Sequence, residues 1–209
     1  KNAYYKNTEI GKVGYYALTK KDDVKVELTC SERVAFHQYT FPDNGAQVYV
    51  DLQHGLRFLF DEQSQQGLVI ESDVKIENNT TISGFCATQN WVSRKYYFTI
   101  TFDQPFINLN HLDPKPKDKA PKYLLDFTLA NNKILKVKIA LSSVAVDGAK
   151  LNMQTEIPHW DFEQVYHNNL ANWETYLDKI DIEAPLKQME IFYTSLYHLF
   201  LQPSNIADV

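Results

Sequence analysis

Between Val13 and Leu141 apolar and polar residues alternate with a period of two. The alternation is clearest in four runs, Val24–Cys30, Ala46–Gln53, Tyr96–Asp103 and Leu135–Leu141. Successive side chains of a strand point to opposite faces, so each run has one apolar face to bury and one that can contact water. Less regular runs predict further strands at Val13–Thr19, Arg33–Phe41, Leu56–Asp61, Gly67–Glu77, Thr80–Thr88 and Lys122–Leu129.

About ten strands with short connections and no intervening helix predict a mainly β fold, in which antiparallel sheets form a sandwich. After Ile157 the hydrophobic period changes to about 3.6, which predicts two α-helices after the sandwich. The first follows Asp161, whose carboxylate is well placed as an N-cap, and extends to Leu177. The second follows Pro185, a residue tolerated at the start of a helix, and covers Leu186–Leu201.

The helix Leu186–Leu201 has apolar residues on nearly all of its sides, which is typical of a helix inside a larger helical assembly. The sequence ends soon after it, at Val209, and begins with Lys1 rather than Met. We therefore expect a piece of a longer protein that ends just inside a second, helical domain.

The composition excludes several classes of protein. The chain of 209 residues is 44% hydrophobic and 13% aromatic, which excludes disorder, and no apolar run approaches the length of a membrane span. Its 21 Lys and Arg against 26 Asp and Glu give a net charge of −5, so we expect neither a nucleic acid nor a membrane as partner. The lysine-rich stretch Lys115–Lys138 is interpreted as a solvated surface loop.

Motifs for common chemistries are missing from the sequence. The six histidines form no HExxH pattern, and His37 is interpreted as a hydrogen-bonded histidine of a sheet. Cys30 and Cys86 lack metal-ligand spacing and are each interpreted as a small core residue, without a prediction as to whether they are bonded. Acidic residues gather near the helices but fit no calcium loop, and we interpret them as solvated carboxylates: Glu156, Asp161, Glu163, Glu174, Asp178, Asp181 and Glu183.

An exposed aromatic ring can stack on a sugar, and Trp91 is the candidate substrate-binding residue on this ground. It lies in the predicted turn between two strands, although packing against a neighbouring domain explains it as well. Trp160 and Trp173 are interpreted as packing residues of the helical linker.

Four stretches, taken in order, resemble glycoside hydrolase family 92, the bacterial exo-acting α-mannosidases. The first contains GYY, VELT and RVAFHQYTFP, and together the four cover nearly the whole chain: Gly14–Pro42, Gly84–Phe106, Leu141–Trp173 and Phe192–Asp208. The resemblance implies an N-terminal super-β-sandwich of the galactose-mutarotase type, linker helices and an (α/α)6 catalytic domain. Residues 1–157 then correspond to the sandwich, 158–184 to the linker helix, and 185–209 to the first helix of a truncated catalytic domain.

The resemblance also implies calcium-assisted hydrolysis of terminal α-mannose with inversion, as in N-glycan degradation, and a periplasmic or secreted location. In the family the catalytic carboxylates and calcium ligands lie on the helical domain, beyond Val209, and a Gly-rich segment of the pocket lies before Lys1. We therefore expect no catalytic residue, no metal ligand, no bound calcium and no activity in this chain. The expected partners are its own helical catalytic domain, α-mannoside glycans and a second copy, through the Leu186–Leu201 helix.

Two other interpretations remain open at this point. The chain can be a stand-alone carbohydrate-binding module anchored by Trp91, or the sandwich of another (α/α)6 glycosidase or phosphorylase.

Overall fold

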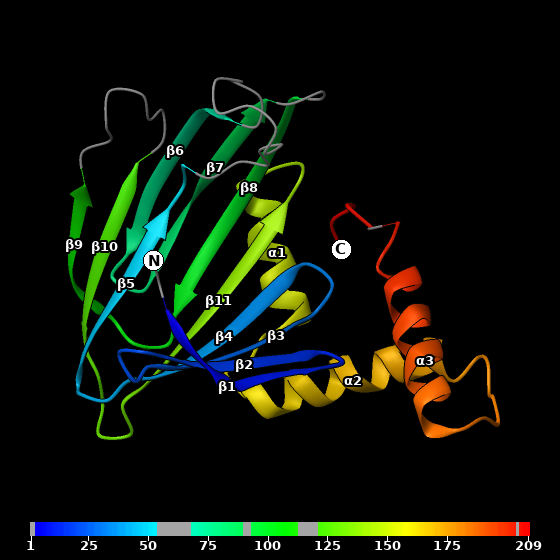
Figure 1. Cartoon of the computed structure of the whole chain (residues 1–209). Coiled ribbons are helices and arrows are strands. Elements are labelled where there is room, and N and C mark those ends of the chain that lie inside the picture. Colours follow the sequence, from blue (N-terminus) through cyan, green and yellow to red (C-terminus); the bar gives the residue numbers. More distant parts are fainter. Residues whose placement is uncertain (1–2, 54–67, 90–92, 113–120, 204) are drawn as a thin grey trace.

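A computed structural model describes residues 3–53, 68–89, 93–112, 121–203 and 205–209 (Figure 1). The strands are β1 (Tyr4–Lys12), β2 (Tyr15–Lys20), β3 (Lys25–Cys30), β4 (Val34–Thr40), β5 (Gly45–Asp51), β6 (Leu68–Asn78), β7 (Thr81–Gln89), β8 (Ser93–Phe102), β9 (Phe106–Leu112), β10 (Lys122–Thr128) and β11 (Ile134–Ser142). The helices are α1 (Val146–Glu156), α2 (Phe162–Leu177) and α3 (Leu186–Phe200).

The strands form two antiparallel sheets, which confirms the predicted sandwich. The larger sheet has eight strands in the order β1-β2-β3-β4-β11-β8-β7-β6, and the smaller has three in the order β5-β10-β9. β11 pairs with both β4 and β8, so the last strand of the sequence lies at the centre of the large sheet. The predicted strand Leu56–Asp61 lies outside the described residues.

The main core lies between the two sheets. Phe102 on the large sheet and Phe127 on the small sheet have ring centroids 5.1 Å apart, and both are almost fully buried. The inward residues of β11, Leu135 and Val137, belong to the same cluster. The inward face predicted for Leu135–Leu141 is therefore confirmed at Leu135 and Val137. The prediction was wrong at Leu141, which is exposed, and at Ala140, which is buried on the opposite face.

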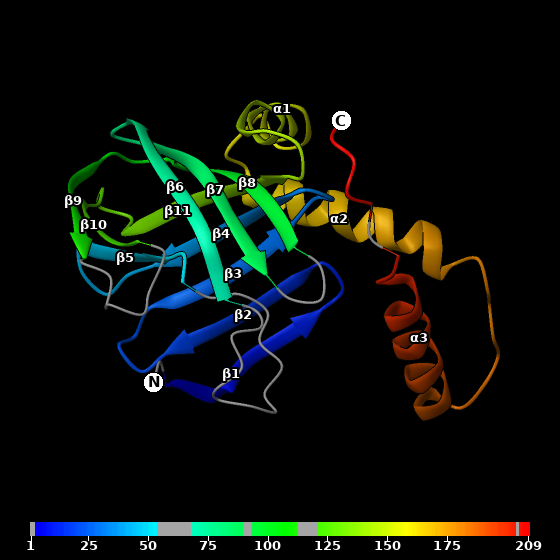
Figure 2. The same cartoon turned by 90° about the horizontal axis from the view of Figure 1, so that it is seen from above.

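A second core covers the opposite face of the large sheet. Phe36 on β4 is fully buried there against Phe162 of α2, with ring centroids 5.4 Å apart. α1 and α2 supply the apolar residues that complete this cluster: Ala149, Met153, Phe162 and Val165. Figure 2 shows α1 end-on next to the large sheet, and α2 running from the sheet toward α3. None of the helices in the described part of the chain is both long and apolar enough to cross a membrane.

The two predicted helices are confirmed, with boundaries within one residue. Asp161 caps α2 as expected, because its Oδ1 accepts a hydrogen bond of 3.0 Å from the Gln164 N–H. The helix α1 was not predicted, and neither were the strands β1 and β9. α1 has no side-chain cap, and the polar residue Asn152 lies among its buried residues. The sequence therefore shows neither a capping residue nor a purely apolar stripe from which this helix could be predicted.

The burial predicted for Cys30 and for Lys138 was wrong. Cys30 is exposed and Cys86 is half-buried, so Cys30 is not a core residue, and both thiols are free. Lys138, assigned to a solvated loop, instead lies on β11 with only 5% of its surface exposed.

Candidate functional site

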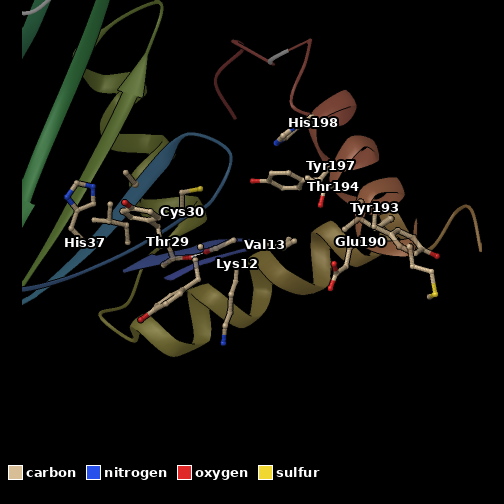
Figure 3. A pocket seen from close by; sticks show the side chains of 18 of the residues that line it. Lys12, Val13, Thr29, Cys30, His37, Glu190, Tyr193, Thr194, Tyr197 and His198 are labelled. Carbon is tan, nitrogen blue, oxygen red and sulfur yellow. Dashed lines mark hydrogen bonds between the residues drawn. The ribbon is translucent and has the colours of Figure 1, made fainter. Parts of the chain in front are cut away.

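A groove lies between the first four strands and α3 (Figure 3). Tyr15 contacts Tyr166 of α2, so its neighbour Tyr16 points to the opposite face of the sheet. Tyr16 pairs in register with Leu28, and Leu28 with His37, which forms a row across β2, β3 and β4. The groove has a volume of about 980 Å³ and is mostly apolar.

The α3 side of the groove is formed by one stripe of the helix. This stripe carries Met189, Glu190, Tyr193, Thr194, Tyr197 and His198. Tyr197 also packs against Trp173 of α2, with ring centroids 4.5 Å apart. Figure 3 shows Tyr197 and Thr194 on α3, across the groove from Cys30 on the sheet.

His37 is a half-buried titratable side chain of the groove. Its Nδ1 lies 2.7 Å from the Tyr39 hydroxyl, which confirms the interpretation of a hydrogen-bonded sheet histidine. Burial lowers the pKa of His37 to about 4 and raises the pKa of Tyr39 to about 12. At neutral pH the pair therefore offers a neutral imidazole and a protonated phenol rather than charges.

The other polar groups of the groove do not form a hydrolytic set. Glu190 is the one carboxylate among the described residues that line it. Cleavage of a glycosidic bond ordinarily needs two carboxyl groups, one on each side of the scissile bond. The Cys30 Sγ lies 3.6 Å from the Asn169 Nδ2, and an amide does not act as the base that a nucleophilic thiol requires.

A second hollow of about 840 Å³ lies where α2, the end of α3 and the β3–β4 turn meet. Here Glu156 accepts hydrogen bonds from the Ser31 hydroxyl at 2.5 Å, from the Arg33 N–H at 3.0 Å and from the Arg33 Nη1 at 2.7 Å. Only 11% of the Glu156 side chain is exposed. The interpretation of Glu156 as a solvated carboxylate was therefore wrong, and its role is to join the end of α1 to the sheet.

The described residues do not fit a calcium site. Calcium takes six to eight oxygen ligands, whereas no group of three or more His, Cys, Asp or Glu side chains gathers in the part of the chain that the structure describes. Asp161 caps a helix and Glu156 binds Arg33, so two members of the acidic run already have other roles.

The structure places two of the three tryptophans. Trp160 packs on Phe36 with ring centroids 5.9 Å apart, and Trp173 joins α2 to α3, so both are packing residues as predicted. Trp91, the candidate sugar-binding residue, lies outside the described residues, and its role stays a prediction.

Comparisons with known proteins agree with the resemblance seen in the sequence. A model described as the glycosyl hydrolase family 92 N-terminal domain matches residues 1–142, and one described as the catalytic domain of that family matches residues 148–209. An uncharacterized secreted glycosidase of Arthroderma benhamiae is 25% identical over 218 residues, which cover 92% of this chain and 28% of that protein.

The structural neighbours include a family 92 α-mannosidase from Bacteroides thetaiotaomicron. It is 26% identical with a TM-score of 0.85, and the match covers 99% of this chain and 29% of the neighbour. The complex of that α-mannosidase with mannoimidazole matches with a TM-score of 0.80 at 26% identity, over 93% of this chain and 27% of the neighbour. The chain thus spans less than a third of the length of these relatives. Because the N-terminal-domain model alone matches more than half of its residues, the chain belongs to glycosyl hydrolase family 92.

Proposed function

We propose that this chain is the non-catalytic sandwich, together with the first helix of the catalytic domain, of an exo-acting α-mannosidase that removes terminal α-mannose from glycans. The observation that carries the proposal is the match to a family 92 α-mannosidase over 99% of the chain. The complex of that relative with mannoimidazole supports mannosides as the class of ligand.

The catalytic groups are proposed to lie outside this chain. An inverting glycosidase needs a general acid and a base carboxylate about 6.5–9.5 Å apart. The groove beside α3 offers Glu190 and a neutral His37 instead, which favours a supporting role for the described residues. Calcium is proposed as a cofactor of the whole enzyme, held by carboxylates outside the described residues.

The chain's own task is then to hold the first helix of the catalytic domain against the sandwich. α3 exposes Leu186, Ile191 and Leu199 at 73%, 60% and 70%. Such a surface is expected to pack against further helices of the catalytic domain. The secreted glycosidase among the relatives supports an exported protein.

The test is an assay of a protein of the relatives' length that contains this chain. It is expected to hydrolyse α-mannosides and to leave β-mannosides intact. The first product detected by proton NMR is expected to be β-mannose, since inversion of an α-linkage gives the β-anomer. A chelator is expected to abolish the activity and added calcium to restore it. Cleavage of β-mannosides alone would contradict the proposed substrate, and α-mannose as first product would contradict inversion.

A further inference from the structure

The position of α3 is weakly determined along its length. Leu196 is its one buried residue, and Figure 1 shows the helix standing apart from both sheets. Among the described residues its ring contacts with α2 are Trp173 with Tyr197 at 4.5 Å and Tyr176 with Phe200 at 5.7 Å. Within the 209-residue chain, the segments at the two ends of α3 are therefore expected to contribute much of what holds this helix in place.

The segment that follows α3 returns to the sandwich and is bound there along residues 206–209. The Ser143 hydroxyl donates to the Ile206 carbonyl at 3.0 Å, and the Arg33 Nε donates to the Ala207 carbonyl. Arg33 at the same time binds Glu156 at the end of α1. The returning segment thus contacts the end of β11, the β3–β4 turn and α1 together.

Asn152 and Asp208 form the centre of this contact. Asn152 is fully buried, and its Nδ2 donates to the Leu141 carbonyl and to the Asp208 Oδ1, both at 2.8 Å. The Asn152 Oδ1 accepts from the Val209 N–H at 3.1 Å. Asp208 Oδ2 accepts from the Ser142 hydroxyl at 2.7 Å. A buried amide with both of its donors and its acceptor engaged fixes its neighbours strongly, because breaking the set leaves buried polar groups unpaired.

Gly148 provides the space for the Asp208 carboxylate. A Cβ atom at position 148 would lie 2.3 Å from the Asp208 Oδ2 and 2.7 Å from the Ser142 Oγ. Glycine inside a helix costs about 1 kcal/mol relative to alanine, so its presence in α1 has a packing reason here. The absence of a side chain at Gly148 thus leaves room for the Asp208 carboxylate to bind Asn152 and Ser142.

We propose that Ser142, Gly148, Asn152 and Asp208 form a latch that fixes the chain leaving α3 to α1 and the end of β11. The latch sets the position of α3 relative to the sandwich. Asn152 and Asp208 are positioning residues in this account. The proposal does not depend on which glycoside the whole enzyme cleaves.

The experiment compares the 209-residue chain with Gly148→Ala, Asp208→Ala and the double variant. Hydrogen exchange measured by mass spectrometry reports on the segment 202–209 and on α3, and urea unfolding reports on the whole fold. Gly148→Ala is expected to speed hydrogen exchange of both segments about tenfold. The reason is that losing a hydrogen bond to a charged group raises the population of the locally open state by about that factor. Asp208→Ala is expected to do the same.

The double variant separates the latch from a general defect of α1. Once Asp208→Ala has removed the carboxylate, the methyl group introduced by Gly148→Ala no longer meets the Asp208 Oδ2 at 2.3 Å, although it still lies 2.7 Å from the Ser142 Oγ. Gly148→Ala is therefore expected to have a smaller effect in that background. The effect of Asp208→Asn is expected to fall between wild type and Asp208→Ala. Unchanged exchange in Asp208→Ala, or fully additive effects of the two substitutions, would overturn the proposal. If Gly148→Ala does not fold, the hydrogen-exchange rates of Asp208→Ala alone test the proposal: faster exchange supports it and unchanged exchange overturns it.

Discussion

The Lys138 ammonium lies 4.2 Å from the centroid of the Trp160 ring and donates a hydrogen bond of 2.9 Å to the carbonyl of Ile157, the residue that ends α1. Burial lowers the pKa of the Lys138 ammonium, which is 5% exposed. A buried cation is thus held by a π face and by the negative end of a helix. The contact joins β11 to the turn between α1 and α2.

Lys138→Ala is expected to destabilise the chain by about 2–4 kcal/mol, because it leaves a cavity and an unpaired carbonyl. Lys138→Met keeps the volume of the stem and is expected to cost about half of that. Urea unfolding of the two variants measures the difference. Equal stability of Lys138→Ala and wild type would contradict the packing role.

His37 predicts a pH dependence of stability. Unfolded His37 binds a proton below its ordinary pKa of 6.5, whereas in the fold its pKa is about 4. Between these values the unfolded state binds more protons, so stability falls as the pH falls through this window, by up to about 3 kcal/mol. His37→Gln is expected to lack this loss and the exposed control His198→Gln to keep it. Urea unfolding between pH 7.5 and 4 tests this, and identical profiles for wild type and His37→Gln would refute it.

The α1 helix gives a test of the predicted domain boundary at residues 157 and 158. Truncation after Ser142 removes both α1 and α2, and it uncovers Val34, Phe36 and Ala140, which are at most 1% exposed. The loss is expected to exceed the stability of about 5–15 kcal/mol of a typical domain, so residues 1–142 should not unfold cooperatively. Residues 1–157 lose Trp160 and Phe162 from this cluster but keep Ala149, Met153 and Ile157, so they are expected to unfold cooperatively at a urea concentration below that of the 209-residue chain. Equal urea transitions for the two truncations would be inconsistent with this assignment.

Strands such as β3, β5, β8 and β11 could be predicted because apolar and polar residues alternate along one continuous stretch of each. α2 could be predicted because Asp161 caps it and a stripe of apolar residues follows. The family resemblance is confirmed by the match to residues 1–142, which excludes the sandwich of another glycosidase family.

The features that were missed depend on contacts between distant residues. Glu156 resembles its solvated acidic neighbours until Arg33, far away in the sequence, is placed beside it. The same holds for Asn152, whose partner Asp208 lies 56 residues further on. Lys138 resembles any lysine of a charged stretch, and only its position at the centre of the large sheet shows that it is buried.

The apolar surface of α3 predicts self-association of the 209-residue chain, because large uncovered apolar patches tend to find partners. Sedimentation velocity is expected to show a dimer or larger species at high concentration. The double variant Ile191→Glu and Leu199→Glu, at two exposed positions of α3, is expected to remain monomeric. A wild-type chain that stays monomeric at every concentration would count against this surface.

The central claim is that this chain supports a glycosidase without containing its catalytic groups. The most direct test is the release of mannose from an α-mannoside by the purified 209-residue chain, beside a protein of the relatives' length that contains it. The account predicts release by the longer protein and none above the enzyme-free blank by the 209-residue chain. Turnover by the 209-residue chain that survives repurification would contradict it.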